Sequence, residues 1–145
     1  MQSTIRIARE AFDPAAELAR LPQGAAVVSF LGRVRAEAGL KSLCLEHYPG
    51  MTEREIGRQA AAAAARWPLA GVTVVHRVGD LKPGEVIVLV AVAAEHRREA
   101  FAACEFLMDH LKTAAPFWKR EDKGETSSWV EAKASDAEAA ERWSK

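Results

Sequence analysis

Hydrophobic and polar residues alternate with two different periods along this chain, and the periods predict a mixture of strands and helices. Short apolar runs between turn residues are typical of strands, whereas apolar residues spaced three and four apart are typical of helices. Strands are predicted at residues 3–8, 25–31, 42–48, 72–78, 85–94 and 129–132. Helices are predicted at residues 13–21, from 52 to about 66, at 96–112 and from 135 to about 143.

Capping and turn residues mark the ends of several of these elements. Asp13 suits a helix N-cap, and Thr52 with Glu55 three residues later predicts a capping box at the start of the alanine-rich second helix. Gly84 can take a positive φ in a tight turn, so the strands beside it are predicted to form an antiparallel hairpin. Because strands and helices mix without strict alternation, the predicted fold class is α+β with a largely antiparallel sheet.

The segment Lys112-Thr-Ala-Ala-Pro-Phe-Trp-Lys-Arg-Glu121 combines clustered charges with large aromatic rings. Pro116 disfavours α geometry in the residue before it, so the helix is predicted to end there and a loop to follow. Amines beside apolar walls and beside one another tend to have a lowered pKa, which favours chemistry on anions or carbonyls. Alternatively, Lys112 only compensates the negative helix end, and Lys119, Arg120 and Glu121 are a solvated charge run.

Two further basic clusters are candidates for binding an anion. His96-Arg97-Arg98 stands at a helix start, where positive charge opposes the helix dipole unless an anion docks there; these side chains could instead reach solvent or pair with neighbouring glutamates. Arg33 and Arg35 share one strand face with Val34 on the other, and they could equally line a solvent-facing edge. Phe30 and Met108 are core residues by default and pocket walls only if the site lies beside them.

The composition of the chain limits which classes of function are possible. The chain has 145 residues, 49% hydrophobic and 28% charged with zero formal net charge, which predicts a single domain over residues 1–145 and argues against a broad nucleic-acid surface. Cys44 and Cys104 are predicted to be reduced thiols, and the scattered histidines predict no metal site. With no signal core and no apolar run of about 20 residues, the predicted location is the cytoplasm.

Six segments, met in order between about Gly24 and Trp143, resemble one known family. They are Val27–Arg35, Leu45–Glu53, Arg66–Leu69, Val74–Gly79, His96-Arg97 and Met108–Glu121. The strings Glu-His-Tyr-Pro-Gly-Met and Lys-Thr-Ala-Ala-Pro-Phe-Trp-Lys-Arg-Glu are the most specific of them. Together these segments resemble the large, catalytic subunit of molybdopterin synthase.

The resemblance implies a fold, an activity and partners. The fold is an α/β hammerhead with an added antiparallel sheet. The activity is that of a sulfurtransferase, which converts cyclic pyranopterin monophosphate (precursor Z) to molybdopterin in molybdenum cofactor biosynthesis. Two dithiolene sulfurs come from the C-terminal thiocarboxylate of a small, ubiquitin-like subunit. The assembly is a heterotetramer built on a homodimer of the large subunit, and it takes no cofactor and no metal because sulfur arrives already activated.

The resemblance also assigns roles to residues of this chain. It makes Lys112 and Lys119 catalytic and places Phe30 and Met108 on apolar pocket walls. The residues that it assigns to substrate binding are Arg33, Val34, Arg35, His96, Arg97, Lys119, Arg120 and Glu121.

Other functions stay open at the level of sequence. The chain could be a non-catalytic scaffold that docks the tail of a ubiquitin-like partner, although intact Lys112 and Lys119 argue against it. It could also be an unrelated transferase that binds a phosphorylated ligand in the same basic pocket. A nucleic-acid binder fits least well because the net charge is zero.

Overall fold

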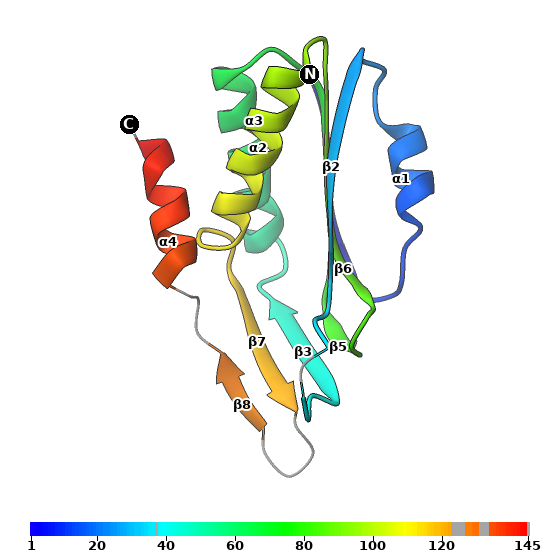
Figure 1. Ribbon diagram of the computed structural model, residues 1–145, viewed down its shortest axis with the longest axis vertical. Coiled ribbons are helices and arrows are strands. Elements are labelled where there is room, and N and C mark those ends of the chain that lie inside the picture. Colours follow the sequence, from blue (N-terminus) through cyan, green and yellow to red (C-terminus); the bar gives the residue numbers. More distant parts are fainter. Residues whose placement is uncertain (37, 123–126, 131–133, 145) are drawn as a thin grey trace.

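Two four-stranded sheets and four α-helices make up the fold, in a computed structural model that describes residues 1–36, 38–122, 127–130 and 134–144 (Figure 1). In the first sheet the strand order is β1 (Gln2–Ala8), β4 (Leu69–Arg77), β6 (Val86–Ala94) and β2 (Ala26–Arg33). In the second sheet the order is β5 (Gly79–Leu81), β3 (Ser42–His47), β7 (Phe117–Asp122) and β8 (Ser127–Val130). Only β1 pairs in parallel, with β4, so the predicted α+β class with a largely antiparallel sheet is confirmed.

Helices cover both faces of the first sheet. The helices α2 (Met51–Arg66) and α3 (Arg97–Leu111) lie on one face, and α1 (Pro14–Arg20) lies on the other (Figure 1). The central strand β6 is apolar on both faces because both are covered. Its Val88, Val90 and Val92 pack toward α2 and α3, while Ala91 and Ala93 pack with Leu21 at the end of α1.

The strand predicted at residues 25–31 is present as β2, but it is not buried as its apolar sequence suggested. It lies at the edge of the first sheet and pairs only with β6. Val27, Phe30 and Leu31 expose 53%, 41% and 37% of their surface. Apolar residues allow a strand to be buried, but burial also requires another element to cover it. Within the described residues of this one chain, no element covers the edge formed by β2.

A second, smaller core joins the two sheets. Val34, Leu43, Leu45 and Leu81 are buried together, and Ile87 packs against both this cluster and the main core. The predicted hairpin around Gly84 is confirmed, with φ at +90° for this glycine. The short strand β5 inside that connection was missed, because its three residues become a strand only by pairing with the distant β3.

The start of α2 differs from the predicted capping box. The helix begins at Met51 after Gly50, whose φ of +83° suits glycine, and the backbone N–H of Gly50 donates to the Glu53 carboxylate at 3.1 Å. Thr52 is therefore inside the first turn and is not a cap, so this prediction was wrong. The cap at Asp13 is confirmed, since its carboxylate accepts from the N–H of Ala15 at 3.0 Å.

The helix predicted at residues 96–112 is α3. Its apolar spacing predicts a stripe that packs on the core, formed by Ala100, Phe101, Cys104, Leu107, Met108 and Leu111, and two aromatic residues depart from this prediction. Ala100, Cys104 and Leu107 are buried as predicted, whereas Phe101 exposes 62% of its surface. Phe106, which the stripe omitted, is buried and touches Trp67 edge-to-face with ring centroids 5.6 Å apart. The buried face of α3 is thus rotated toward α2 and toward the end of the chain.

The loop predicted after the same helix is a loop only as far as Pro116. Residues 117–122 form β7, which pairs with β3 and β8, so the prediction of a loop over residues 112–121 was wrong in its second half. A strand here depends on β3, which lies about 70 residues earlier in the chain, and no local pattern reports such a partner.

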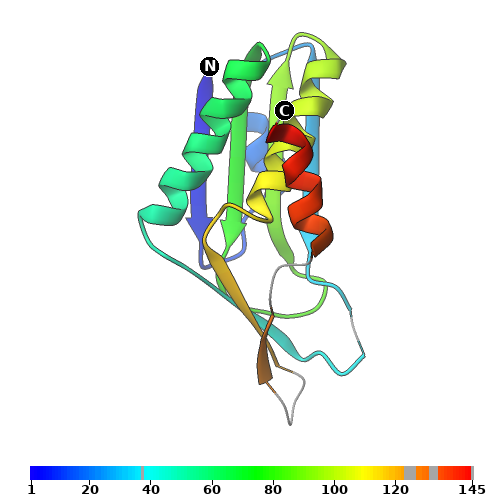
Figure 2. The ribbon, with the colours of Figure 1, turned by 90° about the vertical axis from the view of Figure 1, so that its left-hand side faces the viewer.

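The end of the chain folds back onto α3. The helix α4 (Ala134–Glu141) and the short 3-10 helix η1 (Arg142–Ser144) lie against α3, as Figure 2 shows. Of the strand predicted at 129–132, residues 129 and 130 fall in β8, and residues 131 and 132 lie outside the described part of the chain. Within the described ranges, no helix has both the length and the apolar character to cross a bilayer.

Candidate functional site

The two predicted catalytic lysines stand at the two ends of one short segment, residues 112–119, which is called the lysine segment below. Lys112 is the exposed C-cap of α3, and Lys119 is half-buried in β7. Successive strand residues point to opposite faces, so Lys119 and Phe117 share the face of β7 that also carries Leu45 and His47 of β3. This face looks toward the first sheet, because Phe117 packs against the main core.

Phe117, which lies between the two lysines in the sequence, is one of a stacked pair of rings. The imidazole of His76, on β4, stacks on the ring of Phe117 with centroids 4.0 Å apart and planes at 21°. The carbonyl of Arg77 lies 2.7 Å from Nδ1 of His76, and because a carbonyl only accepts, Nδ1 carries the proton. The stack therefore joins the first sheet to the lysine segment.

The pKa of His76 depends in part on the charge of Lys112. The pKa of His76 is lowered to about 4, mainly by burial; the bond to Arg77 opposes this shift, and the positive charges of Lys112 and His47 add to it. His76 is thus neutral at neutral pH. The Lys112 charge thus acts on an imidazole that stacks on Phe117, and Phe117 shares one face of β7 with Lys119.

A second histidine completes this neighbourhood. His47 lies opposite Phe117 in the pairing of β3 with β7, and only 10% of its side chain is exposed. Its Nε2 is 4.0 Å from the Glu53 carboxylate, and its buried Nδ1 has no hydrogen-bond partner among the described residues. His47, His76 and Phe117 thus bring two imidazoles and one phenyl ring together beside the lysine segment.

The string Lys119-Arg120-Glu121 divides between two faces of β7. Lys119 and Glu121 are on the inner face, opposite Leu45 and Leu43. Arg120 is exposed and lies opposite Cys44 on the other face. Burial and Asp80 raise the pKa of the Cys44 thiol, and the charge of Arg120 opposes this rise. The structure therefore does not bring the Arg120 side chain together with Lys119.

The Arg33 cluster lies at the end of β2 that approaches the second sheet. Arg33 and Arg35 are exposed, and Val34 between them is 3% exposed in the smaller core, as the alternation predicted. The N–H of Val34 donates to Glu85 and its carbonyl accepts from Gly84, both at 2.8 Å. With its side chain and both backbone groups engaged, Val34 positions the two arginines.

His96 and Arg97 lie far from the lysines of the same chain. His96 is the N-cap of α3 and Arg97 its first residue, whereas Lys112 caps the other end, and 15 residues of helix separate them. A helix of that length spans about 22 Å. Figure 1 shows the start of α3 at the end of the molecule opposite the second sheet. One chain alone does not gather all the predicted substrate residues at one place.

The two predicted wall residues lie on the α3 side of the first sheet. Phe30 pairs with Val90 and is 41% exposed on β2, and Met108 is half-buried against the main core. Cys104 lies nearby on α3 as a free thiol, and burial raises its pKa to about 11, so it stays protonated. Cys44 is also a free thiol, as predicted.

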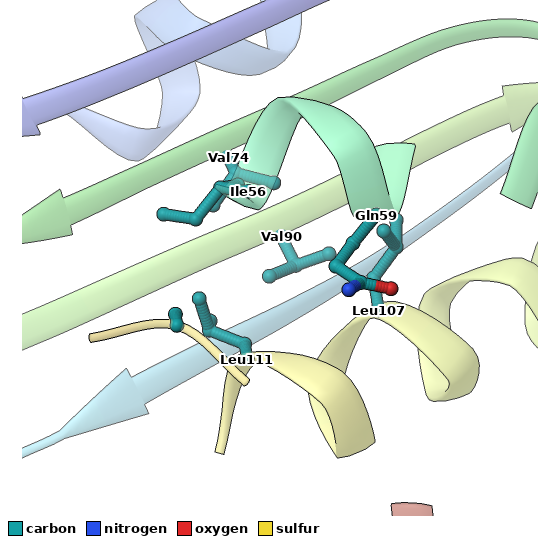
Figure 3. Close-up of a pocket in the computed structure, with 7 residues that line it drawn as sticks. Ile56, Gln59, Val74, Val90, Leu107 and Leu111 are labelled. Atoms are coloured by element: carbon teal, nitrogen blue, oxygen red, sulfur yellow. The ribbon is translucent and has the colours of Figure 1, made fainter. Parts of the chain in front are cut away.

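A small apolar cavity lies beneath the lysine segment, but it has the wrong chemistry for the site. It holds about 10 Å³ and is lined from α2, β4, β6 and α3, as Figure 3 shows. Its walls are Ile56, Gln59, Val74, Val90, Leu107, Leu111 and Ala115. The Gln59 amide is bonded to Glu55 at 2.9 Å, and no charged side chain lines the cavity. It is a packing gap with room for about one water.

Sequence reasoning missed three residues of this neighbourhood: His47, His76 and Thr52. The two histidines fall inside segments that carried the family resemblance, so their place in the sequence was a signal even though no spacing suggested a shared site. Thr52 was noticed only as a cap. In the part of the chain that the structure describes, no group of three or more potential ligands is arranged to hold a metal ion.

Comparison with known proteins adds to this geometry. The family model of MoaE proteins matches residues 7–114. A molybdopterin synthase catalytic subunit of Mesorhizobium japonicum is 58% identical over 97% of this chain and 92% of its own length. One of Pseudomonas aeruginosa is 51% identical over 96% and 97%. The solved molybdopterin biosynthesis MoaE protein of Burkholderia ambifaria superposes with a TM-score of 0.86 at 47% identity, covering 99% of both chains.

Proposed function

The chain belongs to the MoaE protein family, and from this premise we propose how its residues carry out sulfur transfer. It is a catalytic subunit of molybdopterin synthase, an enzyme of molybdenum cofactor biosynthesis. The proposed reaction converts cyclic pyranopterin monophosphate to molybdopterin by inserting two dithiolene sulfurs. The observation that supports this proposal is the His76–Phe117 stack: His76 is within the influence of the Lys112 charge, and Phe117 shares one face of β7 with Lys119.

The sulfur donor is a small, ubiquitin-like subunit whose C-terminal glycine thiocarboxylate enters the site. Lys112 meets this tail, because a cation orients the anionic thiocarboxylate whose sulfur bonds to the substrate carbon. It also stabilises the oxyanion that forms when water then attacks the acyl carbon; the acyl carbon–sulfur bond breaks, sulfur stays on the substrate, and the tail leaves as a carboxylate. Its exposed position at the end of α3 makes it accessible to an incoming peptide. Each tail delivers one sulfur, so two donor molecules are used for each product.

Lys119 works at the pterin. It is half-buried on the same face of β7 as Phe117 and pairs with Leu45, so a substrate that enters over this inner face would meet its side chain. We assign it the transfer of protons at the pterin side chain as carbon–sulfur bonds form. Arg35 and Arg33, at the end of β2, add positive charge for the substrate phosphate.

His96 and Arg97 enter this scheme through a second copy of the chain. They lie at the far end of α3 from Lys112, so their predicted contact with substrate requires a neighbouring subunit. The edge of β2 and the outer side of α3 expose large apolar side chains that such a copy would cover, and these are Val27, Phe30, Leu31 and Phe101. We propose a homodimer of this chain, with one small subunit bound to each copy.

Reconstitution tests the function directly. The chain, the thiocarboxylated small subunit and the cyclic precursor are combined, and the dithiolene product is measured. Lys112→Ala and Lys119→Ala are each expected to reduce conversion at least a hundredfold, an effect on the order of losing one oxyanion or proton-transfer group. The matched control is Lys82→Ala, because Lys82 is an exposed lysine in the turn before β6 and is expected to keep full activity.

Thermal melting of each variant separates a catalytic loss from unfolding. Near wild-type turnover in either lysine variant would remove that lysine from the mechanism. If the unmodified chain binds the tail of the small subunit but yields no product, the chain is a docking scaffold and the proposed reaction is wrong.

A further inference from the structure

Thr52 occupies an unusual position for a helix hydroxyl. It is the second residue of α2 and is completely buried. Its Oγ1 accepts from the backbone N–H of Tyr48 and donates to the carbonyl of Pro116, both at 3.0 Å. One side chain thus joins the end of β3, the start of α2 and the lysine segment, across 64 residues of sequence.

Pro116 is the central residue of a tight turn in the lysine segment. The N–H of Phe117 donates to the carbonyl of Ala115 at 2.9 Å, a three-residue turn centred on Pro116, whose φ is restricted by its ring. Pro116 is four residues after Lys112 and three before Lys119. A bond to its carbonyl therefore fixes the turn that sets how the two lysines lie relative to each other.

His76 makes the second contact to this segment, one residue further on. Its ring covers Phe117, and its own orientation is fixed by the 2.7 Å bond from Nδ1 to the carbonyl of Arg77. His76 exposes only 8% of its surface and lies on β4, a central strand of the first sheet. The segment is thus held from α2 at Pro116 and from β4 at Phe117.

We propose that Thr52 and His76 are positioning residues for sulfur transfer, which hold the lysine segment so that Lys112 and Lys119 face the same reacting group. The inference rests on the proposed function, because it assumes that both lysines act. Neither residue touches substrate in this scheme. Each acts through the backbone or ring of the segment, and displacements on the order of 1 Å in such a segment can reduce turnover about a hundredfold.

The first test compares Thr52→Val with Thr52→Ser. Valine keeps the shape but leaves the Tyr48 N–H and the Pro116 carbonyl without partners, whereas serine keeps the hydroxyl. Thr52→Val is expected to lower kcat at least tenfold with the KM for the precursor changed less than about twofold, since the loss falls on the transition state. Thr52→Ser is expected to restore most of kcat.

The second test compares His76→Ala with His76→Phe. Alanine removes the ring under Phe117 and is expected to lower kcat at least tenfold, and phenylalanine is expected to recover most of that loss because it restores the stack. All rates are taken well below the melting temperature and are corrected for the folded fraction by circular dichroism. A melting temperature that falls while kcat of the folded protein stays at the wild-type value would overturn the proposal.

Hydrogen exchange provides a measurement that does not depend on activity. In Thr52→Val the amides of residues 113–119 are expected to exchange at least tenfold faster than in the wild type, with residues 86–94 of the central strand unchanged. Equal exchange in the lysine segment would refute the positioning role even if activity fell. Active Lys112→Ala and Lys119→Ala variants would instead refute the proposed function, so the two failures are distinguishable.

Discussion

At the scale of single residues, the most unusual group in this protein is the imidazole of His76. It is neutral, almost completely buried, and fixed in one tautomer by the carbonyl of Arg77. Lys112, His47 and the ring of Phe117 surround it, so a proton on His76 would add a positive charge beside one already present. The neutral state of His76 therefore avoids a further positive charge beside Lys112.

This neutrality predicts how stability depends on pH. The pKa of His76 is about 4 in the folded chain against 6.5 as its ordinary value. Between these values the unfolded chain binds the proton and the folded chain does not, so the free energy of unfolding falls as the pH drops from about 6.5 to about 4. The His76 contribution is on the order of 3 kcal/mol at most.

Chemical denaturation of wild type and His76→Phe across this pH range checks the prediction. The variant keeps an aromatic ring against Phe117 but does not titrate, so its stability is expected to fall less steeply toward pH 4. Other groups contribute equally to both proteins, and the difference between the curves isolates His76. Parallel curves would mean that His76 is protonated in the folded chain at the same pH as in the unfolded one.

At the scale of elements, the carboxylate of Asp109 bonds two residues of the chain end to α3. Asp109 of α3 accepts from Nε1 of Trp143 at 2.6 Å and from Arg142 at 2.7 Å. The indole of Trp143 also meets the rings of Trp67 and Phe106 edge-to-face. Residues from α2, α3 and the last helices thus form one aromatic cluster, and Asp109 is its polar anchor.

Asp109→Ala is expected to loosen α4 and η1 from α3. The indole N–H then loses its acceptor in a half-buried place, which costs about 1–2 kcal/mol in the free energy of unfolding. Limited proteolysis is expected to cut the variant faster within residues 134–144. The measurements are a denaturation curve and a time course of cleavage.

Glu105→Ala is the matched control for Asp109→Ala. Glu105 pairs with Arg142 at 2.6 Å, but 59% of its side chain is exposed and it does not contact Trp143. Exposed pairs contribute about 0–1 kcal/mol, so this variant is expected to stay close to the wild type. Equal loss in both variants would show that Arg142, and not the indole, holds the chain end.

At the scale of the whole molecule, the length of α3 separates residues that the family resemblance assigned to one site. Its last turn leads into the lysine segment, while its first turn carries His96 and Arg97 at the opposite end (Figure 1). In the homodimer proposed above, the first turn of one α3 is expected to lie near the lysines of the other copy. A complete site would then need both chains.

Mixing two inactive variants tests this arrangement. Lys119→Ala and His96→Ala are co-expressed in equal amounts, and the whole mixture of randomly paired dimers is assayed with the thiocarboxylated partner and precursor. If the residues act across the dimer, half of the sites in a mixed dimer are intact, so random pairing restores about a quarter of wild-type activity. If they act within one chain, every site is defective and activity stays at the level of the separate variants.

The two sheets are also coupled at this scale. Ile87 packs in both hydrophobic clusters, and the His76–Phe117 stack links β4 to β7. These contacts support the proposal that residues 1–145 unfold as one domain. The lysine segment lies at this junction, so its geometry depends on both sheets.

Much of the local structure of this protein could be predicted from its sequence. The cap at Asp13, the turn at Gly84 and the alternation of Arg33, Val34 and Arg35 follow from the conformational limits of individual residues, and the structure has all three. The amphipathic period placed α3 to within one residue at each end. The strings around His47 and Pro116 indicated the family, and the comparisons confirm it.

Only the tertiary structure decided which surfaces meet. Residues 117–122 are a strand because β3 lies beside them, and β2 is exposed because none of the described elements covers its edge. Thr52 bonds Pro116 across the fold, and His76 reaches Phe117 from another sheet. The physical reason is the same in each case: propensity and periodicity act over a few residues, whereas these contacts join residues that are far apart in the chain.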